Sequence, residues 1–140
     1  MTAARAFGWP VRVYWEDTDA GGIVFYANYL KFFERARTEW LRSLGISQSE
    51  LRERTGGIFI VLETSVRHVR PARLDDELLV TAEVKQWGGA SLIIAQQAFA
   101  RPSDELLCEG TIRIGWVDAT TLRPARIPAS ISGALKATQQ

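Results

Sequence analysis

Three acidic residues stand close together near the N-terminus, where a predicted strand gives way to a predicted helix. They are Glu16, Asp17 and Asp19, within residues 13–41, which read VYWEDTDAGGIVFYANYLKFFERARTEWL. A carboxylate in such a turn can act as a general base or as a nucleophile. It can equally be an ordinary helix cap or turn residue. The segment therefore admits both a catalytic and a structural role for its acids.

The start of the predicted helix offers a second chemical group. Backbone N–H groups of a first helical turn, here around Tyr26 and Ala27, have no partner within the helix and lie at the positive end of its dipole. Gly21 and Gly22 allow a tight turn and the close approach of a substrate. Amides in this position can stabilise the negative charge that develops on a carbonyl oxygen under attack. The segment therefore predicts a carboxylate and free amides that act on one carbonyl group.

The composition further limits the kinds of site that the chain could form. The chain has 140 residues, 46% of them hydrophobic, which predicts a single domain over residues 1–140. Its net charge of +1 gives no electrostatic reason to expect nucleic-acid binding, and no membrane insertion is expected. His68 is the one histidine and Cys108 the one cysteine, so a zinc site is not expected and an internal disulfide is excluded. With no leader segment recognisable, we expect a cytoplasmic protein without metal or cofactor.

The hydrophobic pattern predicts the elements that position the acidic segment. Alternation predicts a strand at 10–16, and a period of 3.6 predicts a long helix at about 27–44. A short helix is expected at 47–54, and another in the tail from 129. The period then changes to 2 and predicts four long strands, at 58–70, 77–87, 91–101 and 106–119.

This order predicts an α+β domain in which one long helix packs on one face of a five-stranded antiparallel sheet. The helix is apolar over more than a narrow stripe, which indicates that the sheet wraps around it or that a second subunit covers it. A single sheet of long strands also leaves edges to be covered, which favours a homo-oligomer.

Residues 14–41 resemble the characteristic segment of hotdog-fold acyl-CoA thioesterases, in the branch of 4-hydroxybenzoyl-CoA thioesterase and the Tol-Pal-associated thioesterase. Residues 70–78, RPARLDDEL, are similar to a second segment of this family, and the order of elements matches over the whole chain. The resemblance implies a hotdog fold, with a long central helix wrapped by a five-stranded antiparallel sheet. It also implies subunits that join edge to edge, dimers that pair into a homotetramer, and active sites between subunits.

The implied activity is hydrolysis of an acyl-CoA thioester to a free acid and CoA. The leaving thiolate needs little acid assistance, because its conjugate acid has a pKa of roughly 8.5. By motif matching, Asp19 falls on the family's catalytic aspartate and Tyr26 on the residue whose backbone amide polarises the carbonyl. In the Tol-Pal branch a histidine commonly stands at the Tyr26 position, so only the backbone role carries over. Attack by Asp19 through a mixed anhydride and activation of a water molecule by Asp19 both remain open.

Substrate contacts are predicted at Gly22, Ile23, Phe25, Tyr29 and Arg123. Arg123 matches a phosphate-contacting arginine of a relative. The turn at 86–91 is basic in that relative but reads QWGGAS here, so its phosphate contacts do not carry over. We expect a small, medium or aromatic acyl group. Thioesters of acyl carrier protein, and a non-catalytic acyl-binding or scaffold role of the same fold, are the alternatives.

The remaining acids and the histidine have simpler interpretations. Glu16 and Asp17 are predicted to be structural. Glu34 and Glu39 are second candidates for the catalytic carboxylate, because some other hotdog thioesterases take it from the long helix. His68 is expected to be largely buried rather than catalytic.

The same alternation predicts the surroundings of His68 and of the one thiol. His68 is expected on a strand face with Ile60, Leu62 and Val66. Cys108 is expected to be an inert thiol in the core.

Overall fold

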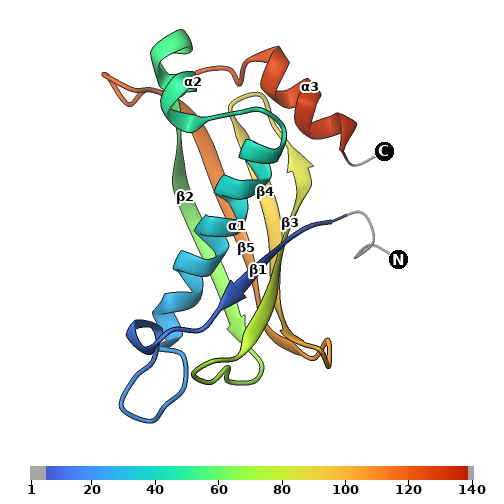
Figure 1. Ribbon diagram of the computed structural model, residues 1–140. Coiled ribbons are helices and arrows are strands. Elements are labelled where there is room, and N and C mark those ends of the chain that lie inside the picture. Colours follow the sequence, from blue (N-terminus) through green and yellow to red (C-terminus); the bar gives the residue numbers. More distant parts are fainter. Residues whose placement is uncertain (1–5, 139–140) are drawn as a thin grey trace.

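Five antiparallel strands form one sheet that curls around a long helix in the computed structural model, which describes residues 6–138 (Figure 1). The strands are β1 (Phe7–Arg12), β2 (Gly57–His68), β3 (Glu77–Trp87), β4 (Ser91–Arg101) and β5 (Leu106–Asp118). The helices are α1 (Tyr29–Ser43), α2 (Gln48–Thr55) and α3 (Ala129–Ala137), with single 3-10 turns η2 (Trp15–Asp17) and η3 (Tyr26–Asn28) before α1. The first strand lies earlier than predicted, because residues 15–17 form a turn instead of continuing it.

The strand order is β1-β3-β4-β5-β2, and every neighbouring pair is antiparallel. The prediction of an α+β fold with one helix against a five-stranded antiparallel sheet is confirmed, and the arrangement is the hotdog fold that the resemblance implies. The two edges of the sheet are the short strand β1 and the long strand β2, which has 12 residues. Within residues 6–138, no helix is long and apolar enough to cross a membrane.

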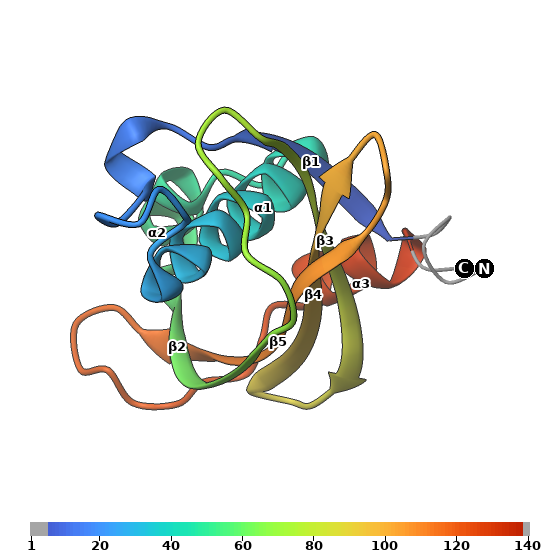
Figure 2. The same cartoon turned by 90° about the horizontal axis from the view of Figure 1, so that it is seen from below.

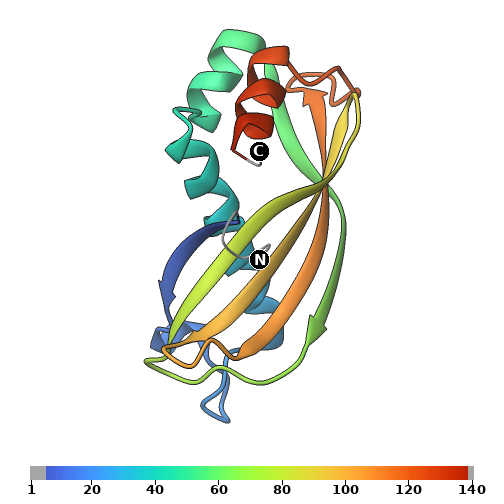
Figure 3. The ribbon, with the colours of Figure 1, turned by 90° about the vertical axis from the view of Figure 1, so that its right-hand side faces the viewer.

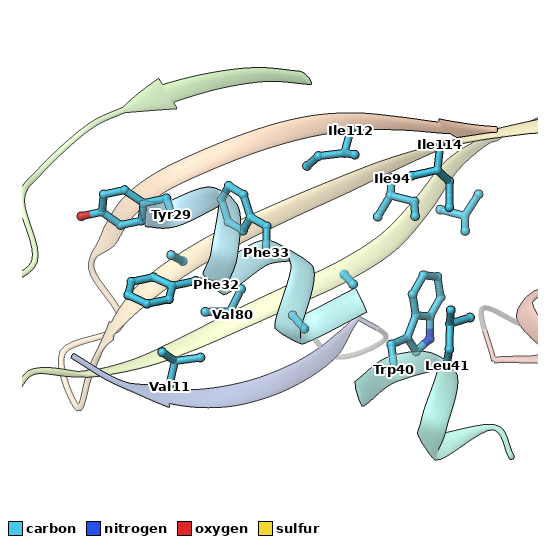
Figure 4. Packing of buried hydrophobic residues seen from close by; sticks show 14 of the residues in the cluster. Val11, Tyr29, Phe32, Phe33, Trp40, Leu41, Val80, Ile94, Ile112 and Ile114 are labelled. Carbon is cyan, nitrogen blue, oxygen red and sulfur yellow. The ribbon is translucent and has the colours of Figure 1, made fainter. Parts of the chain in front are cut away.

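The helix α1 lies inside the curve of the sheet and packs against β1 and β3 (Figure 2). Phe32, Phe33 and Ala36 are completely buried, and Trp40 and Leu41 continue the same face toward the end of the helix (Figure 4). Burying a side chain as large as phenylalanine contributes roughly 1.5–3 kcal/mol. The wide apolar face of α1 is thus largely explained by the sheet that wraps around it.

A β-bulge in β2 changes which side chains face the helix. The pairing of β2 with β5 shifts between Val61 and Glu63, so Leu62 packs on the outer face against Gly115. Beyond the bulge, His68 pairs with Cys108 on the inner face of the sheet. The prediction that His68 shares a face with Leu62 is therefore wrong.

The two ends of the sheet carry different parts of the chain. The loop that contains Asp19 lies at the end where α1 begins, whereas α2, α3 and the segment after β5 lie at the opposite end (Figure 3). Residues that follow β5 are thus separated from Asp19 by the length of the sheet.

Candidate active site

Asp17 anchors the turn that leads from β1 into α1. Its side chain is 3% exposed, and its Oδ2 atom accepts a hydrogen bond of 2.8 Å from the Tyr14 amide. Its Oδ1 atom accepts one of 2.7 Å from the Asn28 side-chain amide, and its backbone oxygen accepts one from Phe25. Because both carboxylate oxygens are occupied inside the protein, Asp17 is structural, as predicted.

Asp19 begins a small hairpin loop that projects from the same turn. Thr18 and Val24 form an isolated bridge at its base, and the Asp19 amide donates to the Ile23 carbonyl at 2.9 Å. Gly22 donates back to the Asp19 carbonyl and has a φ of +80°, a conformation that most other residues avoid. The glycine therefore lets the chain reverse within the few residues between Asp19 and Ile23.

The carboxylate of Asp19 is exposed, and one of its two oxygens accepts a hydrogen bond from a residue that the structure describes. Its Oδ1 atom accepts a hydrogen bond of 2.8 Å from the Gly21 amide, which fixes the side chain relative to its own loop. Its Oδ2 atom has no hydrogen-bond partner or ion pair within residues 6–138. One oxygen is thus held in place, and the other is free to act as a base or a nucleophile.

Two backbone amides are free where the chain enters α1. The amides of Val24, Phe25 and Asn28 each donate to a backbone oxygen. Those of Tyr26 and Ala27 donate no hydrogen bond to any residue that the structure describes. Free N–H groups at the positive end of a helix are suited to stabilising an oxyanion.

A hollow of about 270 Å³ lies beside Tyr26, the first of these two residues. It is mostly apolar and lined by Ile23, Val24, Tyr26, Tyr29, His68, Val69, Arg70 and Pro71. Tyr29 is buried, and burial raises the pKa of its phenol, which accepts a hydrogen bond of 3.2 Å from the Ala72 amide. The hollow brings together three of the predicted site residues, namely Ile23, Tyr26 and Tyr29.

His68 is the group in this hollow that the sequence interpretation missed. It is exposed rather than largely buried, so that expectation is wrong. Its ring lies 6.3 Å from the Tyr26 ring and 5.5 Å from the Tyr29 ring, measured between centroids. The signal that could have found it is its position: it ends β2 immediately before residues 70–78, one of the two segments that carry the family resemblance.

The other predicted substrate contacts lie outside the hollow. Phe25 is 45% exposed, with its ring 4.8 Å from that of Tyr26, and Gly22 lies in the projecting loop. Arg123 belongs to the segment after β5, which lies at the opposite end of the sheet from the loop before α1 (Figure 1). One copy of the chain therefore does not bring Arg123 to the Asp19 loop.

The two helix carboxylates proposed as second candidates are engaged elsewhere. Glu34 accepts a hydrogen bond of 2.6 Å from Thr38, and Glu39 forms an ion pair of 2.9 Å with Arg42. Neither belongs to the lining of the hollow beside Tyr26. Within the described chain, no group of three His, Cys, Asp or Glu side chains could hold a metal ion.

Comparisons with known proteins agree on one family. The model of the thioesterase-like superfamily matches residues 13–135. The acyl-CoA thioester hydrolase YbgC of Escherichia coli O6:H1 is 43% identical over 131 residues, which cover 93% of this chain and 96% of the relative. The acyl-CoA thioesterase YbgC of Haemophilus influenzae is 40% identical over 130 residues, covering 93% and 94%. A crystal structure of a 1,4-dihydroxy-2-naphthoyl-CoA thioesterase from Synechocystis superposes with a TM-score of 0.87 at 21% identity, covering 94% and 96%.

Proposed function

This chain belongs to the thioesterase-like superfamily and is an acyl-CoA thioesterase, and we propose that Asp19 and the free amides of Tyr26 and Ala27 carry out the hydrolysis. The resemblance to hotdog acyl-CoA thioesterases is thereby confirmed. One observation above all supports the proposed site. Tyr26, the first of two successive residues whose amides have no acceptor, lines an apolar hollow, and a carboxylate with a free oxygen lies in the adjoining loop.

The amides act on the thioester carbonyl. Its oxygen accepts hydrogen bonds from Tyr26 and Ala27 and gains negative charge as the carbonyl carbon is attacked. The positive end of the helix favours that charge, so these contacts strengthen in the transition state. When the tetrahedral intermediate collapses, the C–S bond breaks and CoA leaves as a thiolate, which needs no metal ion.

Asp19 supplies the attacking group in either of two ways. Its free Oδ2 removes a proton from water, and the resulting hydroxide attacks the carbonyl carbon; or Oδ2 attacks directly, and water then hydrolyses the mixed anhydride. Both routes start from the same oxygen. In both, the hydrogen bond from Gly21 keeps the carboxylate aimed by holding the other oxygen.

The substrate is proposed to be a small, medium or aromatic acyl-CoA. The hollow of about 270 Å³ lies slightly below the range of about 300–1,000 Å³ typical of pockets for drug-sized ligands, so it suits a compact acyl group. Thiol release from a panel of acyl-CoAs, followed with a thiol reagent, tests this directly. Acyl-CoA that binds without thiol release would support a non-catalytic acyl-binding protein instead.

We also propose that the protein is a homo-oligomer joined through β2. This strand is a free edge of 12 residues, and its Val61 and Leu62 side chains are 52% and 47% exposed. Long edge strands tend to pair, and a two-fold axis pairs a strand with its own copy in antiparallel orientation. The expected homotetramer would contain two such dimers. Light scattering that gives a monomer mass near 15.7 kDa at micromolar concentration would contradict the oligomer.

An antiparallel β2 pair would explain the distance between Arg123 and Asp19. The strand spans roughly 40 Å, and pairing it with its copy sets the His68 end of one subunit beside the Gly57 end of the other. Arg123 of the second copy would then approach the Asp19 loop of the first. Arg126 adds a second cation at this end, since its Nη1 atom lies 3.7 Å from the point where a side chain at Gly89 would begin, in the turn that has no basic residue.

A thioester of acyl carrier protein is the second candidate substrate. The observation in its favour is the turn at residues 88–90, which carries no basic side chain of its own to bind CoA phosphates. Faster hydrolysis of acyl carrier protein thioesters than of matched acyl-CoAs would support it. We propose the cytoplasm as the place of action, which cell fractionation would test.

A further inference from the structure

We propose that His68 recognises the acyl group by donating a hydrogen bond from its Nε2 atom to an oxygen on the acyl chain. The enzyme would then prefer acyl groups that bear such an oxygen over plain hydrocarbon chains of the same length. This inference rests on the proposed function, since it places the acyl group in the hollow beside Tyr26.

The hollow is suited to the acyl group rather than to the CoA arm. Most of its lining is apolar, with Ile23, Val24, Val69 and Pro71 among the residues that form it. The pantetheine arm of CoA carries amide groups, which would lose hydrogen bonds to water in such surroundings. A compact, mainly apolar acyl group loses little there.

Cys108 offers His68 a hydrogen-bond donor at the Nδ1 atom. The Cys108 Sγ atom lies 3.9 Å from His68 Nδ1, and Cys108 is completely buried. Burial raises the pKa of this thiol to about 12, so at neutral pH it stays protonated and keeps an S–H that can donate. In the proposal this S–H donates to Nδ1, and the one N–H of a neutral imidazole then lies on Nε2.

The same contact sets the direction of the Nε2–H bond. The two ring nitrogens point to nearly opposite sides of an imidazole, so a ring whose Nδ1 faces the buried thiol turns Nε2 away from the core. The rings of Tyr26 and Tyr29 lie beside the imidazole as well, at 6.3 Å and 5.5 Å between centroids. No acceptor for Nε2 is found within residues 6–138, whereas Arg70, the cation in the same lining, is paired with Glu105 at 3.4 Å.

A purely structural role makes a different prediction. If His68 only packs its ring against the two tyrosines, phenylalanine should replace it without any change in substrate preference. If it donates a hydrogen bond, phenylalanine keeps the packing and loses the preference. Glutamine, which has a side-chain N–H, should retain part of it.

The experiment compares kcat/KM for 3-hydroxybutyryl-CoA and butyryl-CoA, which differ by one hydroxyl group on the acyl chain. The wild type should favour the hydroxylated substrate by about 2- to 10-fold, the size of one hydrogen bond in a partly solvated pocket. His68→Phe should bring the ratio close to one, and His68→Gln should lie between. Ser65→Ala, on the outer face of the same strand, is the matched control and should leave the ratio unchanged.

A second pair of variants tests the part played by the thiol. Cys108→Ala removes the donor to Nδ1 and should lower the ratio, whereas Cys108→Ser restores a donor and should preserve it. Melting temperatures measured on the same samples identify any variant that has lost stability. An effect on the ratio in both variants, or in neither, would contradict the proposed role of Cys108 and with it the orientation of Nε2.

The outcomes separate this inference from the proposed function. If the wild type hydrolyses both substrates at equal rates, or if His68→Phe lowers both rates by the same factor, His68 does not read the acyl group, although the enzyme remains a thioesterase. If no acyl-CoA is hydrolysed by the wild type, both the proposed function and this inference fail.

Discussion

Replacing Asp17 should destabilise the fold, although this residue stands only two positions from the proposed catalytic aspartate. Asp17→Ala removes the acceptor for two donors, the Tyr14 amide at 2.8 Å and the Asn28 side chain at 2.7 Å. The site is 3% exposed, so water replaces the lost carboxylate poorly. The turn before α1 would lose its main anchor.

The size of the effect follows from these contacts. Hydrogen bonds to a charged group contribute about 1.5–3 kcal/mol each, so two of them predict a loss of about 3–6 kcal/mol in the free energy of unfolding. Asp17→Asn should cost less, about 2–3 kcal/mol, because Asn28 can turn its amide and both contacts survive as neutral hydrogen bonds. The expected order of stability is wild type, then Asp17→Asn, then Asp17→Ala.

Urea unfolding followed by circular dichroism, at one fixed protein concentration, measures this order. Glu16→Ala is the matched control, since Glu16 is exposed and should change stability by no more than about 0.5 kcal/mol. If Asp17→Ala also changes stability by no more than about 0.5 kcal/mol, the structural role given to this carboxylate is refuted.

Three further predictions concern the site and the core. Gly21→Ala would place a Cβ 3.3 Å from Asp19 Oδ1, so kcat should fall while the melting temperature is retained; an unchanged kcat would show that this carboxylate need not be held. Arg123→Ala should raise KM for acyl-CoA with kcat nearly unchanged, which corresponds to a loss of roughly 1–3 kcal/mol in kcat/KM. Lys85→Ala is the control and should leave KM unchanged, because Lys85 is paired with Glu83 at 2.8 Å. Burial raises the pKa of Cys108 from 9.0 to about 12, so the unfolded chain loses this proton first and the free energy of unfolding should fall as pH rises from 9 toward 12. The fall should be smaller in Cys108→Ser, as measured by urea unfolding at several pH values.

The sequence predicted the fold class well because its signals are local and strong. The 3.6 period of α1 and the four alternating runs after residue 57 recur in the structure with boundaries shifted by only a few residues. The structural role of Asp17 was also predictable in outline. The hydrogen bond that holds Asp17 to Asn28 was not, because it joins residues 11 positions apart through a turn that hydrophobic patterns do not describe.

The misplacement of His68 has a specific physical cause. One extra residue at a β-bulge moves every later side chain of a strand to the other face. The sequence of β2 has no hydrophobic pattern that predicts the bulge at Leu62. The exposure of His68 has a second cause, since the backbone of α1 lies closer to β1 and β3 than to β2, and Tyr29 is the residue of α1 whose ring reaches His68. Arg123 is a third kind of case, because one chain leaves it at the far end of the sheet from Asp19, and the proposed pairing of subunits cannot be derived from the order of residues in one chain.

The central claim is that the free oxygen of Asp19 initiates thioester hydrolysis, and kcat of Asp19→Asn for acyl-CoA tests it most directly. Asparagine keeps the shape and the hydrogen bond from Gly21 but removes the charge and the basicity. We predict that kcat falls by about 10²–10⁴, or further if Asp19 is the covalent nucleophile, while the melting temperature stays close to that of the wild type. Glu34→Gln and Glu39→Gln should each cost far less. An Asp19→Asn variant that melts at a lower temperature yet hydrolyses acyl-CoA at nearly the wild-type rate per folded molecule would contradict the claim.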